Sequence, residues 1–385
     1  MVGEQFLLLP GPTPIPQRVL SAMNRSMVNH RGAEFKEILF ETTENIKKVY
    51  RTEHNVLIYP SSGSGGLEAA VVNFISPGDK VLAVSIGVFG DRLAKIAKEF
   101  GAQVEKIDFP WGQAADPQVI KERINEDKEH KIKAVLITHN ETSTGVVNDI
   151  KTIRREIMHH PALFIIDSVS GLAAMDLRMD EWGLDVVVSG SQKAFMIPPG
   201  LSFLAFNDRA YKVHQKTTNC KFYWDVSNGL KYLEKGQTPF TPPISLFYGL
   251  RESLQIMLEE GLDNILVRHA NYRNLVRSSI KAMGLDLFAE DQSASAAVTA
   301  VLAPKEIGGN KIRQYMREKF NIVVAGGQQT LDDVIFRIGH LGYVRELDLV
   351  AVIAALEITL SKLGAKVNIG AGVERAQQLI LNRID

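Results

Sequence analysis

Residues 185–200 of this chain read DVVVSGSQKAFMIPPG, an apolar run that passes into a polar loop centred on Lys193. An upstream run, LFIID at residues 163–167, has the same character and ends in Asp167. Short apolar runs of this kind predict buried parallel strands. Because open α/β sheets place their chemistry at the carboxyl ends of their strands, we expect Asp167 and the loop with Lys193 to meet at one site.

Lys193 follows its apolar run closely and is flanked by Ser191, Gln192 and a Pro-Pro-Gly turn. A lysine amine that is withdrawn from water can be neutral and can form a Schiff base with a carbonyl compound. The alternative is an ordinary solvated lysine in a loop. The residues around Lys193 leave both interpretations open.

Strands and helices alternate over roughly the first 200 residues. Apolar runs predict strands at residues 55–60, 80–86, 102–109 and 134–139, and helical spacing predicts helices at residues 17–27, 36–50, 91–100, 116–127 and 148–159. This alternation indicates βαβ crossovers and a mostly parallel sheet. Ahead of it, the prolines within residues 6–16 predict an extended arm rather than a helix.

A turn rich in glycine and serine, SSGSGGLEAAVVNF at residues 61–74, follows the strand at residues 55–60 directly and leads into a helix. Such a turn offers backbone N–H groups and hydroxyls beside the positive end of a helix dipole, which suits a phosphate group. The alternative is a tight turn with an ordinary serine cap.

The character of the sequence changes after about residue 211. Residues 221–243, KFYWDVSNGLKYLEKGQTPFTPP, are aromatic and rich in turn residues, which suits a surface loop or a subunit contact. Residues 244–284 predict one or two long amphipathic helices, and strands follow at 297–304, 321–327 and 334–339. We therefore expect an N-terminal arm at 1–16, a large domain at 17–260 and a small C-terminal α/β domain at 261–385.

The bulk composition excludes several classes of protein. The 44 basic residues balance the 44 acidic ones, which argues against an extended surface for nucleic acid or anionic membrane. Cys220 is the only cysteine, so the chain can form no intrachain disulfide and no cysteine-rich metal site. No run approaches the roughly 18 apolar residues of a membrane span. We expect a soluble, cytoplasmic protein without a metal site.

The order of these features resembles the class V aminotransferases of the fold type I superfamily, which depend on pyridoxal 5'-phosphate. Within that class the chain is most similar to the alanine–glyoxylate and serine–glyoxylate (serine–pyruvate) aminotransferases. The resemblance covers nearly the whole chain and rests on the motifs LLLPGPTPIP, SSGSGGLEAA, GVFGDR, THNETSTGV, DSVS, GSQKAFMIPPG, TPFTPPISLFYGLRESL and FRIGHLGY. It implies an α/β fold with a large domain around a mostly parallel central sheet and a small C-terminal α/β domain.

The resemblance implies roles for the residues around the cofactor ring. Lys193 would form a Schiff base with the cofactor and then move the proton between the substrate Cα and the cofactor C4′. Asp167 would pair with the pyridinium nitrogen, although an aspartate after a strand can also be a helix cap. Phe89 would stack on one ring face, unless it is an ordinary core aromatic, and Val169 would pack on the other.

The phosphate end is implied in the same way. Ser62, Gly63 and Ser64 would bind the phosphate at the helix start, with help from Gln192. Ser64 departs from relatives that have histidine there, but a hydroxyl can also donate a hydrogen bond. Thr142 would hydrogen-bond near the 3-oxygen of the cofactor.

Two further threonines correspond to positions that reach the phosphate from a neighbouring subunit. These are Thr238 and Thr241, in the motif TPFTPP, although some relatives have tyrosine at the position of Thr238. A site completed in this way implies a homodimer whose active sites are shared across the interface.

Arg337 matches the arginine that binds the α-carboxylate of the substrate through a bidentate fork. The alternative is an edge-strand arginine in a surface ion pair. Gly11 and Pro12 of the N-terminal arm would line or cover the substrate entrance, and His30 and Arg31 are further candidates there.

The implied reaction is transamination between a small amino acid, serine or alanine, and a small 2-oxo acid, glyoxylate or pyruvate. It would follow a ping-pong course through pyridoxamine phosphate. No second arginine is evident for a dicarboxylate side chain, which favours small neutral substrates. One alternative is a lyase or cysteine desulfurase of the same class, although Cys220 stands only a short way after Lys193. Another is a non-catalytic subunit with the same fold.

Overall fold

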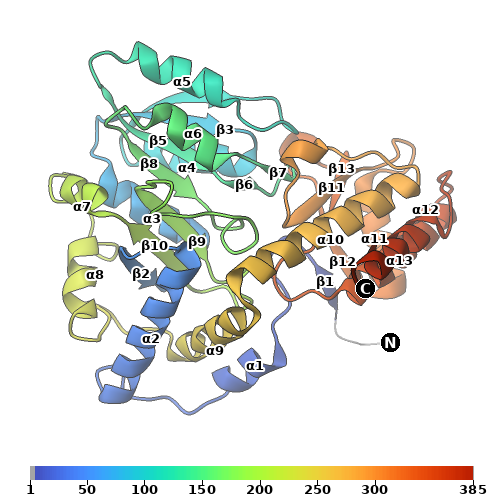
Figure 1. The fold of residues 1–385 in the computed structure, drawn as a ribbon, viewed down its shortest axis with the longest axis horizontal. Helices are drawn as coiled ribbons and strands as arrows, with labels where there is room; N and C mark the ends of the chain where they lie inside the picture. Colours follow the sequence, from blue (N-terminus) through green and yellow to red (C-terminus); the bar gives the residue numbers. More distant parts are fainter. Residues whose placement is uncertain (1–4, 385) are drawn as a thin grey trace.

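The computed structural model describes residues 5–384, and its larger part is built on a seven-stranded sheet (Figure 1). The strands lie in the order β2-β10-β9-β8-β5-β3-β4. Their bounds are β2 Asn55–Tyr59, β3 Lys80–Ser85, β4 Gln103–Asp108, β5 Ile132–Thr138, β8 Leu163–Asp167, β9 Val186–Gly190 and β10 Ser202–Phe206.

Most of this sheet is parallel, as the alternation of strands and helices predicts. The neighbouring pairs from β9 to β4 are all parallel, whereas β10 runs antiparallel to both β9 and β2. Strand β10 was not predicted from the sequence pattern. Its five residues follow directly on the lysine loop, and they are all buried between two other strands.

Helices cover both faces of the sheet and give it a hydrophobic core on each side. Alternate residues of β5 show the division, because Val135 and Ile137 pack on one face and Ala134 and Leu136 on the other. The first core includes α2, α5, α6 and α9, and the second includes α3, α4, α7 and α8. The bounds of these elements and of the neighbouring short ones are α1 Gln17–Met23, α2 Ala33–Tyr50, α3 Gly63–Phe74, α4 Val88–Glu99, α5 Pro117–Glu126, β6 Asn140–Glu141, β7 Val146–Val147, α6 Ile150–Ile157, α7 Asp208–His214, α8 Val226–Leu233 and α9 Ile244–Glu260.

A second sheet, with strand order β1-β12-β13-β11, lies beside the first and has its own hydrophobic core. Strand β1, near the start of the chain, joins it by pairing in parallel with β12, so an N-terminal segment belongs to the same sheet as three C-terminal strands (Figure 1). The elements here are β1 Phe6–Leu8, α10 Leu262–Ala282, β11 Val298–Leu302, α11 Gly309–Phe320, β12 Ile322–Gly326, β13 Ile335–Gly339, α12 Glu346–Lys362 and α13 Ala371–Ile384, with short 3₁₀ turns at Asp291–Ser293 and Gln329–Leu331.

The structure differs from the sequence predictions at a few element boundaries. Helix α4 begins at Val88, so Phe89 lies inside its first turn instead of before it. Helix α8 lies within residues 221–243, where a loop is predicted. The division into an arm at 1–16 and domains at 17–260 and 261–385 stays a proposal, and residues 1–4 of that arm lie outside the described residues.

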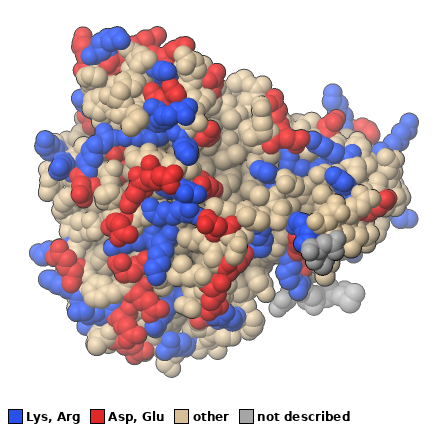
Figure 2. Space-filling model, viewed as in Figure 1, with Lys and Arg blue, Asp and Glu red and all other residues tan. Residues whose placement is uncertain are grey.

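Charged side chains of both signs are present on the face of the molecule that Figure 2 shows, with uncharged areas between them. Basic and acidic side chains are interspersed there and neither kind forms a continuous field, in keeping with the balanced composition. Over residues 5–384, no helix combines the length and the apolar character that crossing a membrane requires.

Candidate active site

A cavity of about 260 Å³ lies at the carboxyl ends of β8 and β9 and at the starts of α3 and α4. It brings together most of the residues predicted to hold a cofactor. The predicted residues that line it are Ser62, Gly63, Ser64, Phe89, Thr142, Asp167, Val169, Gln192 and Lys193.

Lys193 lines this cavity, and the residue is partly buried. Its Nζ donates a hydrogen bond of 2.5 Å to the backbone carbonyl of Pro10. Burial, opposed by the charge of Asp167 and reinforced by that of Arg337, lowers the pKa of the Lys193 amine to about 8. Near pH 7 about one tenth of this amine is therefore neutral and nucleophilic, a far larger fraction than for an ordinary lysine.

Asp167 ends β8 and lies in the same cavity wall. Its side chain is 4% exposed, and one carboxylate oxygen accepts a hydrogen bond of 2.9 Å from the backbone N–H of Val169. Burial raises the pKa of Asp167 to about 6, whereas the positive charge of Lys193 lowers it. A buried carboxylate in this setting favours a cationic partner.

The start of α3 has the features of an anion site. Ser62 is the N-cap residue in extended conformation, and within the described chain its side chain makes no capping hydrogen bond. Gly63 is packed so closely that a Cβ there would lie 2.8 Å from both Cγ atoms of Val169. Oε1 of Gln192 is buried without a hydrogen-bond partner among the described residues. The turn can therefore receive a phosphate group against the helix N-terminus.

Two predicted substrate residues do not line the cavity but touch residues that do. Arg337, 5% exposed, donates hydrogen bonds from Nη1 to the Thr142 carbonyl at 2.6 Å and from Nε to the Gly326 carbonyl at 2.7 Å. Burial lowers the pKa of Arg337 to about 10, so it stays cationic at neutral pH. A Cβ at Gly11 would lie 2.6 Å from Nζ of Lys193.

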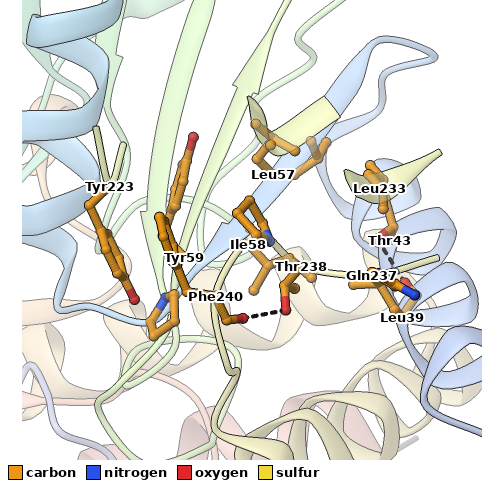
Figure 3. A pocket seen from close by; sticks show the side chains of 14 residues that line it. Leu39, Thr43, Leu57, Ile58, Tyr59, Tyr223, Leu233, Gln237, Thr238 and Phe240 are labelled. Atoms are coloured by element: carbon orange, nitrogen blue, oxygen red, sulfur yellow. Dashed lines mark hydrogen bonds between the residues drawn. The ribbon is translucent and has the colours of Figure 1, made fainter. Parts of the chain in front are cut away.

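Thr238 and Thr241 do not lie in the described lining of this cavity. Thr238 donates a hydrogen bond of 2.7 Å to the Phe240 carbonyl and lines a separate, largely apolar cavity with Tyr223 (Figure 3). Thr241 is exposed. Arg31 contacts the same segment, because its Nη1 donates to the Thr238 carbonyl at 2.8 Å.

The described lining also includes residues that the sequence analysis did not single out. Asn140 donates to the hydroxyl of Ser170 at 3.0 Å, and its Oδ1 is buried without a partner in the described structure. Asn140 lies among the polar residues that follow β5, and this position was a signal that it could line the cavity. Arg92 places its guanidinium 4.7 Å from the centre of the Phe89 ring and 3.5 Å from Oγ of Ser64. The sequence did not indicate this contact, because it follows from a helix that begins at Val88 and so includes both Phe89 and Arg92.

The lining suits an organic cofactor with a phosphate group. The lysine amine, the buried aspartate and the uncapped helix start surround one space, and the buried oxygens of Gln192 and Asn140 lack partners within residues 5–384. In that same range no cluster of three or more His, Cys, Asp or Glu side chains could hold a metal ion.

The family model for class-V aminotransferases matches residues 5–346. The chain belongs to the class-V aminotransferase family. The resemblance seen in the sequence is thereby confirmed, and with it the α/β fold of this superfamily. This class-V aminotransferase is an enzyme of the transferase class.

The similar proteins are named either as a hydrogenase subunit or as aminotransferases. The soluble hydrogenase 42 kDa subunit of Anabaena cylindrica is 43% identical over 99% of this chain and 100% of its own length. The serine–glyoxylate aminotransferase of Arabidopsis thaliana is 37% identical over 99% and 96%. The crystal structure of alanine–glyoxylate aminotransferase from Nostoc sp. superposes with a TM-score of 0.89 at 30% identity, covering 94% of this chain and 96% of that one.

Proposed function

We propose that this aminotransferase uses pyridoxal 5'-phosphate to exchange an amino group between serine or alanine and glyoxylate or pyruvate in a ping-pong reaction. The observation that carries the proposal is the juxtaposition of Lys193 and Asp167 in one buried cavity with the uncapped start of α3. When bound, the cofactor supplies an electrophilic carbon for amines and an electron sink for the pair released at the substrate Cα.

Lys193 and Asp167 divide the chemistry between them. The Lys193 amine would hold the cofactor covalently, and once released its Nζ would take the proton from the substrate Cα and deliver it to the cofactor C4′. Its lowered pKa supports this role, because a neutral amine is a base and an ammonium is not. The Asp167 carboxylate would stabilise a positive charge on the ring nitrogen.

The remaining lining residues would fix the orientation of the cofactor. Ser62, Gly63, Ser64 and Gln192 would bind its phosphate at the start of α3, and Arg92 adds positive charge at that end because it contacts Ser64. Phe89 and Val169 would cover the two ring faces, and Thr142 would lie near the 3-oxygen.

Arg337 and Gly11 would define the substrate end. The cationic Arg337 would bind the α-carboxylate that all amino acid and 2-oxo acid substrates share. Arg92 is committed to the phosphate end in this arrangement, so no further arginine is assigned to a second substrate carboxylate. That supports small neutral donors. Glyoxylate as acceptor is supported by the names of two of the similar proteins.

We further propose a homodimer in which Thr238 and Thr241 complete the partner's phosphate site. Support comes from the surface around them. Phe222 is 79% exposed, and its ring centre lies 5.6 Å from that of Phe240, next to the exposed Thr241. Exposed aromatic clusters of this kind favour burial in an interface. A cytoplasmic location remains part of the proposal and rests on composition.

The alternative functions have less support. A desulfurase needs a nucleophilic cysteine that reaches the substrate, whereas Cys220 is exposed and stands apart from the described lining residues. The name of the Anabaena cylindrica relative suggests a subunit role, but such a role does not require Lys193 and Asp167 to lie together in one cavity.

Borohydride reduction of the protein loaded with pyridoxal phosphate tests the proposal. We expect one reduced adduct, mapped by mass spectrometry to Lys193, and its loss in Lys193→Ala but not in Lys212→Ala, which changes an exposed lysine. A panel of amino donors and 2-oxo acids then identifies the substrates. Wild-type turnover by Lys193→Ala would refute the assignment, and adduct formation without turnover of any pair would favour the subunit role.

A further inference from the structure

Glu141 has the most completely bonded carboxylate near the active site, although none of the roles above uses it. It is 0% exposed and follows Asn140 in the short strand β6. Its Oε2 accepts hydrogen bonds from the backbone N–H groups of Phe89 at 3.0 Å and Gly90 at 3.1 Å. Its Oε1 accepts from the backbone N–H of Ser143 at 3.1 Å and from the Ser143 hydroxyl at 2.5 Å.

These bonds cap helix α4 from a distant segment. The Ser143 hydroxyl oxygen accepts a hydrogen bond of 3.1 Å from the N–H of Val88, so Glu141 and Ser143 together satisfy the first three N–H groups of the helix. The N-cap residue of α4 is Gly87, which has no side chain to do this. A Cβ at Gly87 would lie 2.5 Å from Oγ of Ser143 and 2.6 Å from Cγ of Glu141, so glycine leaves room for the carboxylate.

The capped helix start carries Phe89, one of the residues that line the cavity. The next residue after Glu141 is Thr142, which also lines the cavity. Its carbonyl accepts a hydrogen bond of 2.6 Å from Nη1 of Arg337. One turn therefore connects the aromatic side chain proposed for a cofactor face to the arginine proposed for the substrate carboxylate.

Burial raises the pKa of Glu141, and its hydrogen-bond donors act in the opposite direction. All four of its partners are donors, and a negative charge is stabilised at the positive end of a helix dipole. The negative charge of Glu141 also affects two other residues of the site, because it raises the pKa of Asp167 and that of Arg337.

We propose that Glu141 is a positioning residue of the active site, whose carboxylate fixes Phe89 against the cofactor and holds the Thr142 carbonyl that orients Arg337. This inference rests on the proposed function, because the side chains that Glu141 positions are those assigned to cofactor and substrate.

Glu141→Gln is the direct test, because it keeps the shape of the side chain but replaces one acceptor oxygen with an NH₂ group. That group must then face a pair of donors, either those of α4 or those of Ser143. The matched control is Glu357→Gln, in α12. Glu357 is also buried, at 3% exposure, and accepts from the backbone N–H groups of Gly370 at 2.9 Å and Gly372 at 2.8 Å.

The measurements are the dissociation constant for pyridoxal phosphate, from absorbance titration of cofactor-free protein, and the melting temperature of the same preparation. We expect Glu141→Gln to raise the dissociation constant about tenfold. Glu357→Gln should lower the melting temperature while its dissociation constant stays within about twofold of wild type. Combining Glu141→Gln with Phe89→Ala should weaken binding by less than the product of the two single effects, because both act on the same ring contact.

Ser143→Ala is a milder second variant that removes one donor to Glu141 and the acceptor for Val88, and we expect about a threefold rise in the dissociation constant. If Glu141→Gln does not fold, an unchanged constant in Ser143→Ala refutes the role of Glu141. The role is also refuted if Glu141→Gln leaves the dissociation constant unchanged, or if Glu357→Gln raises it by the same factor. It is refuted as well if the effects of Glu141→Gln and Phe89→Ala on the dissociation constant simply multiply in the double variant. Wild-type protein that binds no pyridoxal phosphate would instead refute the proposed function, and the role of Glu141 with it.

Discussion

Gly11 lies directly against the side chain of Lys193, so closely that a Cβ at Gly11 would be 2.6 Å from both Cδ and Nζ of the lysine. The neighbouring residues of the arm make further contacts. Thr13 donates its hydroxyl to the Lys193 carbonyl at 3.1 Å, and its N–H donates to the Gln192 carbonyl at 3.2 Å. The N-terminal arm therefore forms one wall around the reactive amine.

Gly11→Ala should displace Lys193. The added methyl group overlaps the lysine side chain, and a φ of +119° at this position is unfavourable for alanine, at roughly 1–3 kcal/mol. We expect a lower yield of the borohydride-fixed cofactor adduct at Lys193. Gly364→Ala is the control, because Gly364 also has a positive φ, +87°, but nothing lies within 4 Å of its Cβ position. Equal adduct yields in the two variants would contradict a contact effect.

The reactivity of Lys193 should depend on pH with a midpoint near 8. Burial disfavours the ammonium form, so the neutral amine gains population as the pH rises through about 8, well below the usual range for lysine. The rate of reductive methylation at Lys193 in cofactor-free protein, measured by peptide mass spectrometry against pH, checks this. Exposed Lys212 serves as the internal reference, and a common midpoint for both lysines would contradict the prediction.

Two neighbouring charges should move that midpoint in opposite directions. The negative charge of Asp167 raises the pKa of Lys193, so Asp167→Asn should lower the midpoint. The positive charge of Arg337 lowers the pKa of Lys193, so Arg337→Gln should raise it. The same methylation profile measures both shifts. Shifts of the same sign would mean that altered burial, and not charge, dominates in these variants.

Local sequence pattern was sufficient to predict the strands that end in Asp167 and near Lys193, and the glycine turn at the start of α3. Each of these features consists of adjacent residues with a clear apolar or glycine signal. The alternation of strands and helices predicted the mostly parallel sheet, and the family resemblance gave the fold class; both are confirmed. The roles of the individual site residues stay predictions.

Features that depend on distant partners were not predictable in this way. β1 pairs with β12 across more than 300 residues of sequence, and nothing within Phe6–Leu8 indicates that partner. Glu141 looks like one polar residue among many until the folded chain brings the start of α4 to it. The contact of Arg92 with Phe89 could be predicted only from the actual start of α4, because a helix that begins at Val88 places the two side chains side by side.

Arg337→Gln should lower kcat/KM by a similar factor for all substrates. If Arg337 binds the α-carboxylate, its loss removes a charged hydrogen-bonded pair worth about 1.5–3 kcal/mol, so kcat/KM should fall about tenfold to a hundredfold for every donor and acceptor. Arg313→Gln is the control, because Arg313 bonds to the Val324 carbonyl and lies outside the described cavity lining. A loss confined to one substrate would contradict a role at the shared carboxylate.

Complementation between two impaired variants should show whether Thr241 acts in the partner's site. In a mixed dimer of Lys193→Ala and Thr241→Ala chains, a threonine that crosses the interface leaves one site with both Lys193 and Thr241, whereas a threonine that serves its own chain leaves none. We therefore expect coexpressed, tagged mixed dimers to bind cofactor at one site per dimer with wild-type affinity, measured by borohydride fixation at limiting pyridoxal phosphate. The Thr241→Ala homodimer should bind it about tenfold more weakly, since it loses a hydrogen bond to a charged phosphate. Mixed dimers with only the weakened affinity would place Thr241 in its own chain's site, and a monomeric wild-type protein would refute the shared site altogether.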